Sequence, residues 1–148
     1  MWVKAVKGVR MNWSRSKSRK SKYANQKSKL GGVTFDSKLE SEHYVLLLNR
    51  LSLGEIKDLA RQVKIELTSN AEKHKDKVHY VADFVFLDLE LNQWIVWDSK
   101  GMPTDAYKLK RKWLLDNFNG FLFIEHAKKE KKIYKPRGDT PLKIRVRE

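Results

Sequence analysis

The chain has 148 residues, 41% of them hydrophobic, and a formal net charge of +14 with a pI near 9.9. This length suits one domain with a single core. The charge predicts a polyanionic partner, with nucleic acid favoured over an anionic membrane because the basic segments lack the apolar face needed for insertion. The absence of cysteine excludes disulfides, zinc ribbons and thiolate nucleophiles. No apolar run has the length of a signal peptide or a membrane span, so we expect a cytoplasmic protein without a membrane partner.

The first 30 residues differ in composition from the rest of the chain. They contain ten lysines or arginines and no acidic residue. Because like charges repel and little apolar surface is available, above all over residues 14–22, we predict a flexible basic arm. The arm either contacts nucleic acid or only keeps the protein in solution. Its candidate phosphate contacts are Arg15, Lys17, Arg19 and Lys20.

The folded core is expected over residues 31–127. A basic extension follows, 128–148, whose prolines and glycine predict turns and extended chain. The core opens with a helix that Asp36 or Ser37 can cap and that ends near position 51. Apolar residues recur along this helix at helical spacing. They are Leu39, Tyr44, Leu47, Leu48 and Leu51.

Three extended segments follow the helix. Residues 56–67 alternate apolar and polar positions toward their end, and residues 78–87 are rich in β-formers. Residues 94–99 form the third segment, after a short turn region. The second and third segments therefore predict a hairpin.

A second helix is expected after a break at residues 101–103. Thr104 is a suitable N-cap for residues 105–118, and Gly120 suits the C-terminal stop. The predicted buried stripe of this helix consists of Ala106, Leu109 and Trp113. A short apolar strand, 121–125, ends the core, and a helix between two strands of one sheet usually makes a right-handed crossover. The element order predicts an α/β fold, a mixed β-sheet flanked by helices with an α-β-β-β-α-β core.

The third strand ends in the polar sequence Asp98-Ser99-Lys100 after four apolar residues. Residues two apart on a strand share a face, so Asp98 and Lys100 point to one side and the Ser99 side chain to the other. Carboxylate oxygens, with the Ser99 carbonyl as a further ligand, suit Mg²⁺ or Mn²⁺. Lys100 could then orient or activate a water and stabilise negative charge. Alone, the motif could equally be a surface ion pair.

Two further acids could join this cluster. Asp83 interrupts an otherwise apolar strand, where an isolated carboxylate is costly unless it is paired or bound to a metal, and the hairpin would place it beside Asp98. The alternative is a structural partner for a lysine or arginine. Glu40, in the first helix, could reach the same metal ion as a further ligand if the helix packs on the sheet. Glu42 lies on another face, and either glutamate could simply be exposed.

The second helix carries a group of cations that we expect to face outward. They either follow phosphates or form a solvated basic surface. These cations are Lys108, Lys110, Arg111 and Lys112. Trp94 and Trp97 are expected to fill the core. The four histidines show no metal-ligand spacing, and no chemistry is assigned to them.

Three segments together resemble the PD-(D/E)XK nuclease superfamily, in particular a small phage-encoded, junction-resolvase-like branch. They are F-D-S-K-L-E at 35–40, Y-V-A-D-F at 80–84 and W-D-S-K-G at 97–101. The resemblance covers residues 31–125 and implies a restriction-endonuclease-like core. No proline precedes the aspartate of the middle segment, and the acid of the last segment is the shorter one, which slightly reduces its reach to a metal.

The resemblance implies a role for each matching residue. Glu40 matches the acid of the first helix, Asp83 the leading aspartate, and Asp98 and Lys100 the (D/E)XK pair. Gln62 matches a glutamine near the site of related nucleases. The implied activity is Mg²⁺- or Mn²⁺-dependent DNA hydrolysis without a small-molecule cofactor, on branched DNA during phage recombination in the host cytoplasm. Such enzymes commonly act as homodimers because two strands must be cut.

Two other functions would also fit this sequence. One is a basic DNA-binding module without catalysis, for which replacing Asp98 would leave binding unchanged. The other is a structural or packaging factor, for which no divalent metal would bind at the acidic residues. Cleavage in the presence of Mg²⁺ or Mn²⁺ distinguishes the enzyme from both.

Overall fold

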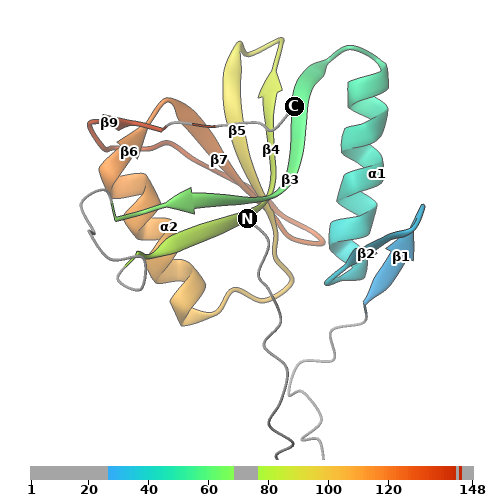
Figure 1. Cartoon of the computed structure of the whole chain (residues 1–148), viewed down its shortest axis with the longest axis horizontal. Coiled ribbons are helices and arrows are strands. Elements are labelled where there is room, and N and C mark those ends of the chain that lie inside the picture. Colours follow the sequence, from blue (N-terminus) through green and yellow to red (C-terminus); the bar gives the residue numbers. More distant parts are fainter. Residues whose placement is uncertain (1–26, 69–76, 143, 145–148) are drawn as a thin grey trace, which may run out of the picture.

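The computed structural model describes residues 27–68, 77–142 and 144, and these form a mixed sheet with a helix on each face (Figure 1). The five strands of the sheet lie in the order β3-β4-β5-β7-β8. The pair β5 and β7 is parallel, and the other three pairs are antiparallel. The expected α/β class and the flanking helices are therefore confirmed. The basic arm at positions 15–20 lies outside the described residues.

The predicted core elements are present in the predicted order. They are α1 (Lys38–Ser52), β3 (Ile56–Glu66), β4 (His79–Asp88), β5 (Gln93–Ser99), α2 (Asp105–Asn117) and β7 (Phe121–His126). Ser37 caps α1 and Thr104 caps α2, each by accepting a hydrogen bond from a backbone N–H of the first turn. Gly120 does not end α2, because Phe118 already leaves the helical conformation. Its φ of 85° instead forms the turn into β7.

Further strands extend this core. The hairpin of β1 (Ser28–Leu30) and β2 (Val33–Phe35) turns at the Gly-Gly pair and lies beside the start of α1 (Figure 1). In the basic extension, β8 (Lys131–Tyr134) pairs with β7 as the outer strand of the sheet. The short strands β6 (Phe118–Asn119) and β9 (Thr140–Pro141) pair with each other.

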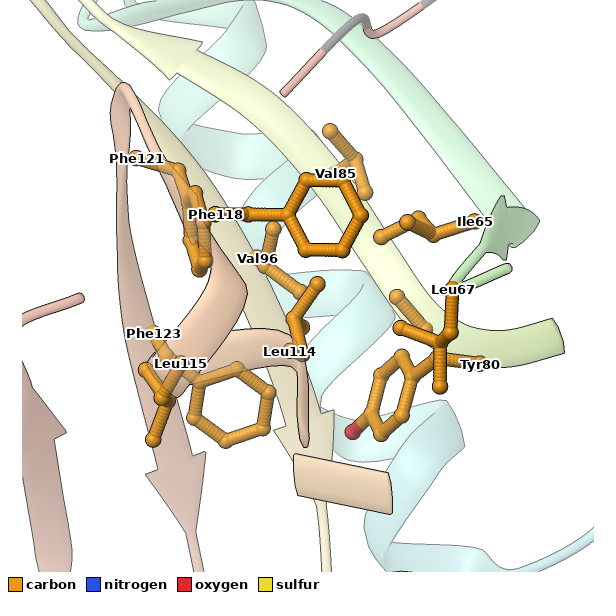
Figure 2. Packing of buried hydrophobic residues seen from close by; sticks show 11 residues of the cluster. Ile65, Leu67, Tyr80, Val85, Val96, Leu114, Leu115, Phe118, Phe121 and Phe123 are labelled. Atoms are coloured by element: carbon orange, nitrogen blue, oxygen red, sulfur yellow. The ribbon is translucent and has the colours of Figure 1, made fainter. Parts of the chain in front are cut away.

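Each face of the sheet buries its own hydrophobic cluster. On the α2 face, aromatic rings from β4, β6 and β7 gather around the end of α2 (Figure 2). On the α1 face, Leu47 of α1 packs on aromatic and aliphatic residues of β3, β4, β5 and β7. Trp97 belongs to the α1 cluster and Trp94 packs against the α2 cluster, as expected for core residues.

The predicted buried stripes of both helices were partly wrong. Of the apolar set of α1, Leu47 is fully buried, whereas Leu48 and Leu51 are more than one-third exposed. The buried face of α1 is completed instead by polar residues. In α2, Leu109 is 66% exposed and Ala106 is also exposed, because the helix turns other residues to the sheet. Those residues are Tyr107, Arg111, Leu114 and Leu115.

Strands β3 and β4 both bend sharply along their length (Figure 1). Gln62 has a φ of 51°, a left-handed conformation that costs energy for a non-glycine residue. Ala82 contributes to the α2 cluster, but Phe84, of the same parity, contributes to the α1 cluster. The strand therefore changes the face it presents at Asp83. A bend of this kind re-aims the side chain at the irregularity.

Within the described residues, no helix combines the length and apolar character needed to cross a membrane.

Candidate active site

A cleft opens where β5 ends, between the first turns of α1 and α2. Its volume is about 420 Å³, and it takes residues from both helices, β4, β5 and the 101–104 loop. The lining residues are Asp36, Ser37, Leu39, Glu40, Asp83, Ser99, Lys100, Gly101, Met102, Thr104 and Tyr107. Four of them were predicted from sequence and come from distant parts of the chain: Glu40, Asp83, Ser99 and Lys100.

Asp98 does not itself line the cleft, but it lies next to the lining residue Lys100. It is 0% exposed. Lys100 Nζ is 3.3 Å from Asp98 Oδ1, but within the described residues neither carboxylate oxygen has a well-formed hydrogen bond. Burial raises the pKa of Asp98 to about 7, against the opposing effect of Lys100. Lys100 therefore compensates the buried charge of Asp98 only in part.

Asp83 and Lys100 complete the central group of charges. Lys100 Nζ is 4.0 Å from Asp83 Oδ2, and the same oxygen accepts a 2.8 Å hydrogen bond from the backbone N–H of Ser99. Burial raises the pKa of Asp83, while Lys100 and the Ser99 N–H oppose that rise. Burial lowers the pKa of Lys100, but Asp98 and Asp83 outweigh it and the net shift is upward. Lys100 is therefore held as an ammonium between two carboxylates.

Glu40, rather than Glu42, faces the cleft. Glu40 is 3% exposed, and Glu42 lies on the surface with Lys38 as its partner. The amide of Gln62 donates a 2.9 Å hydrogen bond to Glu40 Oε1, and the backbone N–H of Asp36 donates to Oε2 at 3.2 Å. Burial, and next the nearby Asp83, raise the pKa of Glu40. The strained backbone of Gln62 thus serves to anchor a carboxylate of the cleft.

A second charged cluster supports the α2 side of the cleft. Glu125 of β7 accepts hydrogen bonds from the Tyr107 hydroxyl, at 2.7 Å, and from Arg111. The ammonium of Lys100 lies 4.9 Å from the centre of the Tyr107 ring. Arg111 is consequently not one of the outward-facing cations, because it pairs with buried Glu125 and stacks near Tyr134. Lys108, Lys110 and Lys112 are exposed as expected.

Sequence reasoning assigned no role to the histidines, yet two of them lie beside the cleft. His43 is 6% exposed, and its Nδ1 is 2.6 Å from Ser99 Oγ. Its ring stacks on His126 at 4.2 Å and meets the edge of Trp97. Burial, and then His126, lower the pKa of His43 to about 4. One signal was available, since His43 follows Glu40 by three positions and so shares its helical face.

Comparison with known proteins gives one family match. Residues 20–134 match the family described as "Protein of unknown function (DUF1064)". The chain belongs to the DUF1064 family. No curated protein and no solved structure matches it. The DUF1064 match includes every residue that lines the cleft, together with the strands and helices that carry these residues.

The cleft of this DUF1064 protein offers a small set of oxygen ligands for a metal. The described residues include no group of three or more histidine, aspartate or glutamate side chains arranged to hold an ion. Mg²⁺, however, commonly takes one or two carboxylates and completes its shell with waters and substrate phosphate. Asp98, whose oxygens have no hydrogen bond from the described residues, and Asp83 fit that donor set.

Proposed function

We propose that this protein is a divalent-metal-dependent DNA endonuclease that hydrolyses phosphodiester bonds in the cleft at the end of β5. One observation carries the proposal: the carboxylate of Asp98 is fully buried and has no well-formed hydrogen bond within the described residues. Leaving a charged group in this state costs several kcal/mol unless a partner compensates it. Lys100, 3.3 Å from Asp98 Oδ1, compensates this charge only in part, because burial still raises the pKa of Asp98 to about 7. A metal ion bound at the cleft would supply the remaining compensation.

Asp83 and Asp98 are the residues that would hold Mg²⁺ or Mn²⁺, with the Ser99 carbonyl as the further ligand expected from sequence. When bound, such an ion polarises a phosphoryl oxygen, lowers the pKa of a bound water and neutralises the leaving oxygen. Glu40 also lines the cleft and is electrostatically coupled to Asp83. The hydrogen bond from Gln62 fixes the position of Glu40, and so also the position of any water that Glu40 orients.

Lys100 contributes positive charge rather than a base. The upward shift of its pKa keeps it protonated at neutral pH, and its ammonium is held by Asp98, Asp83 and the Tyr107 ring. A fixed ammonium next to a phosphate stabilises the negative charge that develops during hydrolysis. Of the roles expected from sequence, Lys100 therefore keeps the orientation of a water and the stabilisation of negative charge. It does not activate the water as a base.

Several features favour a phosphate-bearing polyanion as the substrate. The first turns of both helices border the cleft, and the positive end of a helix dipole favours an anion. The net charge of +14 attracts nucleic acid over a longer range. Lys108, Lys110 and Lys112 provide exposed cations on α2. Branched DNA and a homodimeric enzyme, both implied by the resemblance to junction-resolving nucleases, belong to the same proposal.

The test is cleavage of supercoiled, linear, branched and single-stranded DNA in Mn²⁺, with an EDTA control. We expect the wild-type protein to cut at least one of these substrates, and Lys100→Ala to cut it far more slowly while still binding it. Glu42→Gln is the matched control on the surface of α1 and should cut at the wild-type rate. Failure of the wild-type protein to cut any of the four would overturn the proposal. Equal cutting by Lys100→Ala would remove Lys100 from the mechanism.

A further inference from the structure

A buried hydrogen-bond chain leads from α1 to the carboxylate of Asp83. His43 Nδ1 and Ser99 Oγ are 2.6 Å apart, and the backbone N–H of Ser99 donates to Asp83 Oδ2 at 2.8 Å. Both His43 and Ser99 are buried. We infer that His43 is a positioning residue of the cleft, which fixes Ser99 and, through its backbone N–H, orients the Asp83 carboxylate.

The position of Ser99 explains why it needs a fixed partner. It is the last residue of β5, and only one further backbone bond, from the Lys100 N–H to the His126 carbonyl at 3.2 Å, joins the chain to β7 before the 101–104 loop. Strand ends have fewer constraints than strand centres, because ladder hydrogen bonds stop there. The hydrogen bond between His43 of the neighbouring helix and Ser99 adds to the Lys100 bond and holds the strand end in place. The same end carries the N–H on which the orientation of Asp83 depends.

The environment of His43 in turn fixes its ring. The imidazole is stacked on His126 of β7, with ring centres 4.2 Å apart, and lies edge-on to Trp97 of β5 at 5.5 Å. In this packed orientation Nδ1 faces the hydroxyl of Ser99. Packing therefore fixes the position of the His43 ring, and the hydrogen bond to Ser99 fixes the position of Ser99 in turn. Residues that do not touch the metal orient ligating carboxylates and imidazoles at metal sites in the same way.

His43 and Glu40 together connect α1 to two strands of the sheet, β3 and β5. Glu40 and His43 lie three positions apart on the buried face of α1. Glu40 binds Gln62 of β3, whereas His43 binds Ser99 of β5. The helix is thereby attached at two points to the strands on either side of β4, which carries Asp83. Loss of the His43 contact would let the end of β5 move relative to Glu40.

The competing explanation is that His43 only fills space between α1 and the sheet. Three substitutions separate the two roles. His43→Phe keeps an aromatic ring on His126 and Trp97 but removes Nδ1. His43→Asn loses ring area but places a polar atom near the former Nδ1 and so can restore the bond to Ser99. Ser99→Ala removes the hydroxyl and keeps the backbone N–H. Glu42→Gln serves as the surface control on the same helix.

The first measurement needs neither metal nor DNA, so it is independent of the proposed function. We expect amide hydrogen exchange of Ser99, relative to Val96 in the same strand, to speed up about tenfold in His43→Phe and in Ser99→Ala, as for the loss of one hydrogen bond. The double variant should exchange no faster than either single one, and His43→Asn should stay near wild type. Unchanged exchange in His43→Phe, or effects that multiply in the double variant, would overturn the inference.

The second measurement is kinetic and rests on the proposed function. We expect kcat for DNA cleavage to fall about 10- to 100-fold in His43→Phe and Ser99→Ala, with KM little changed, because the phosphate contacts are intact. His43→Asn should recover most of kcat. A loss in KM alone, or no recovery in His43→Asn, contradicts a positioning role. If the wild-type protein does not cleave DNA, the proposed function fails, while the exchange measurement still decides the inference.

Discussion

Replacing Asp98 by asparagine should stabilise the protein at high pH while removing its proposed activity. Burial raises the pKa of Asp98 to about 7 from an ordinary value of 3.8. An acid whose pKa is raised by folding destabilises the fold wherever it must ionise. This penalty is absent below the unfolded pKa, grows as pH rises, and is complete above about pH 7. The asparagine side chain stays neutral at every pH and avoids the penalty.

The size of the effect follows from the two pKa values. A pKa of about 7 in place of 3.8 corresponds to about 4 kcal/mol of destabilisation at about pH 8 and about 1 kcal/mol at about pH 4.5. The buried amide introduces a cost of about 1–3 kcal/mol for its own unpaired groups, but that cost does not depend on pH. The stability of Asp98→Asn relative to wild type should therefore rise by about 3 kcal/mol between the two pH values.

Urea denaturation in EDTA at both pH values measures this difference, with linear extrapolation to water. Glu42→Gln, on the exposed side of α1, should differ from wild type by less than about 0.5 kcal/mol at each pH. Saturating Mn²⁺ should then stabilise the wild-type protein and leave Asp98→Asn unchanged, because a ligand stabilises only the state that binds it. A stability difference that does not change with pH would refute the reasoning from burial.

Three further predictions concern the rest of the structure. A methyl group at Gly138 would lie 2.0 Å from the backbone at the end of α2. Gly138→Ala should therefore lower the free energy of unfolding in urea by about 2 kcal/mol, and an unchanged midpoint would contradict this contact. Arg111→Leu leaves buried Glu125 without its cationic partner, with only the Tyr107 hydroxyl still bonded to it, and should cost about 3 kcal/mol. The double variant Arg111→Leu with Glu125→Leu should recover most of this loss, and an equally unstable double variant would count against the pair. The double variant Lys110→Gln and Lys112→Gln should reduce, by about 2, the slope of the logarithm of the DNA binding constant against the logarithm of salt concentration. An unchanged slope would show that α2 does not contact phosphates.

The helix caps and the hairpin could be predicted from sequence because they depend on neighbouring residues. Ser37 and Thr104 act as caps through backbone groups three positions away, and β4 and β5 are joined by a short turn. The shared face of Asp98 and Lys100 also follows from the period of a strand. These features need no knowledge of how distant segments pack.

The buried faces of the helices could not be predicted in the same way. Hydrophobic spacing favoured Leu48 and Leu109, yet both are exposed. The faces that pack on the sheet include Glu40, His43 and Arg111, whose burial depends on partners elsewhere in the chain. A polar residue with such a partner is indistinguishable in sequence from a solvated one.

The site itself was predictable in part. Asp83 and Asp98 stood out because they interrupt or end apolar strands. The structure brings Glu40, Asp83 and Lys100 to one cleft. The bend at Gln62, with its φ of 51°, was not foreseen, since a glutamine in a strand gives no sign of left-handed backbone. Nor was the contact of His43 with Ser99, which joins residues 56 positions apart.

Single-turnover cleavage of labelled duplex and branched DNA, measured over a titration of Mn²⁺, tests the central claim most directly. We predict that wild-type cleavage is absent in EDTA, rises with Mn²⁺ and saturates, and that Asp98→Asn does not cleave at any Mn²⁺ concentration although it still binds the DNA. Binding without cleavage by the wild-type protein over the whole titration would contradict the claim, as would a metal-dependent rate in Asp98→Asn equal to that of wild type.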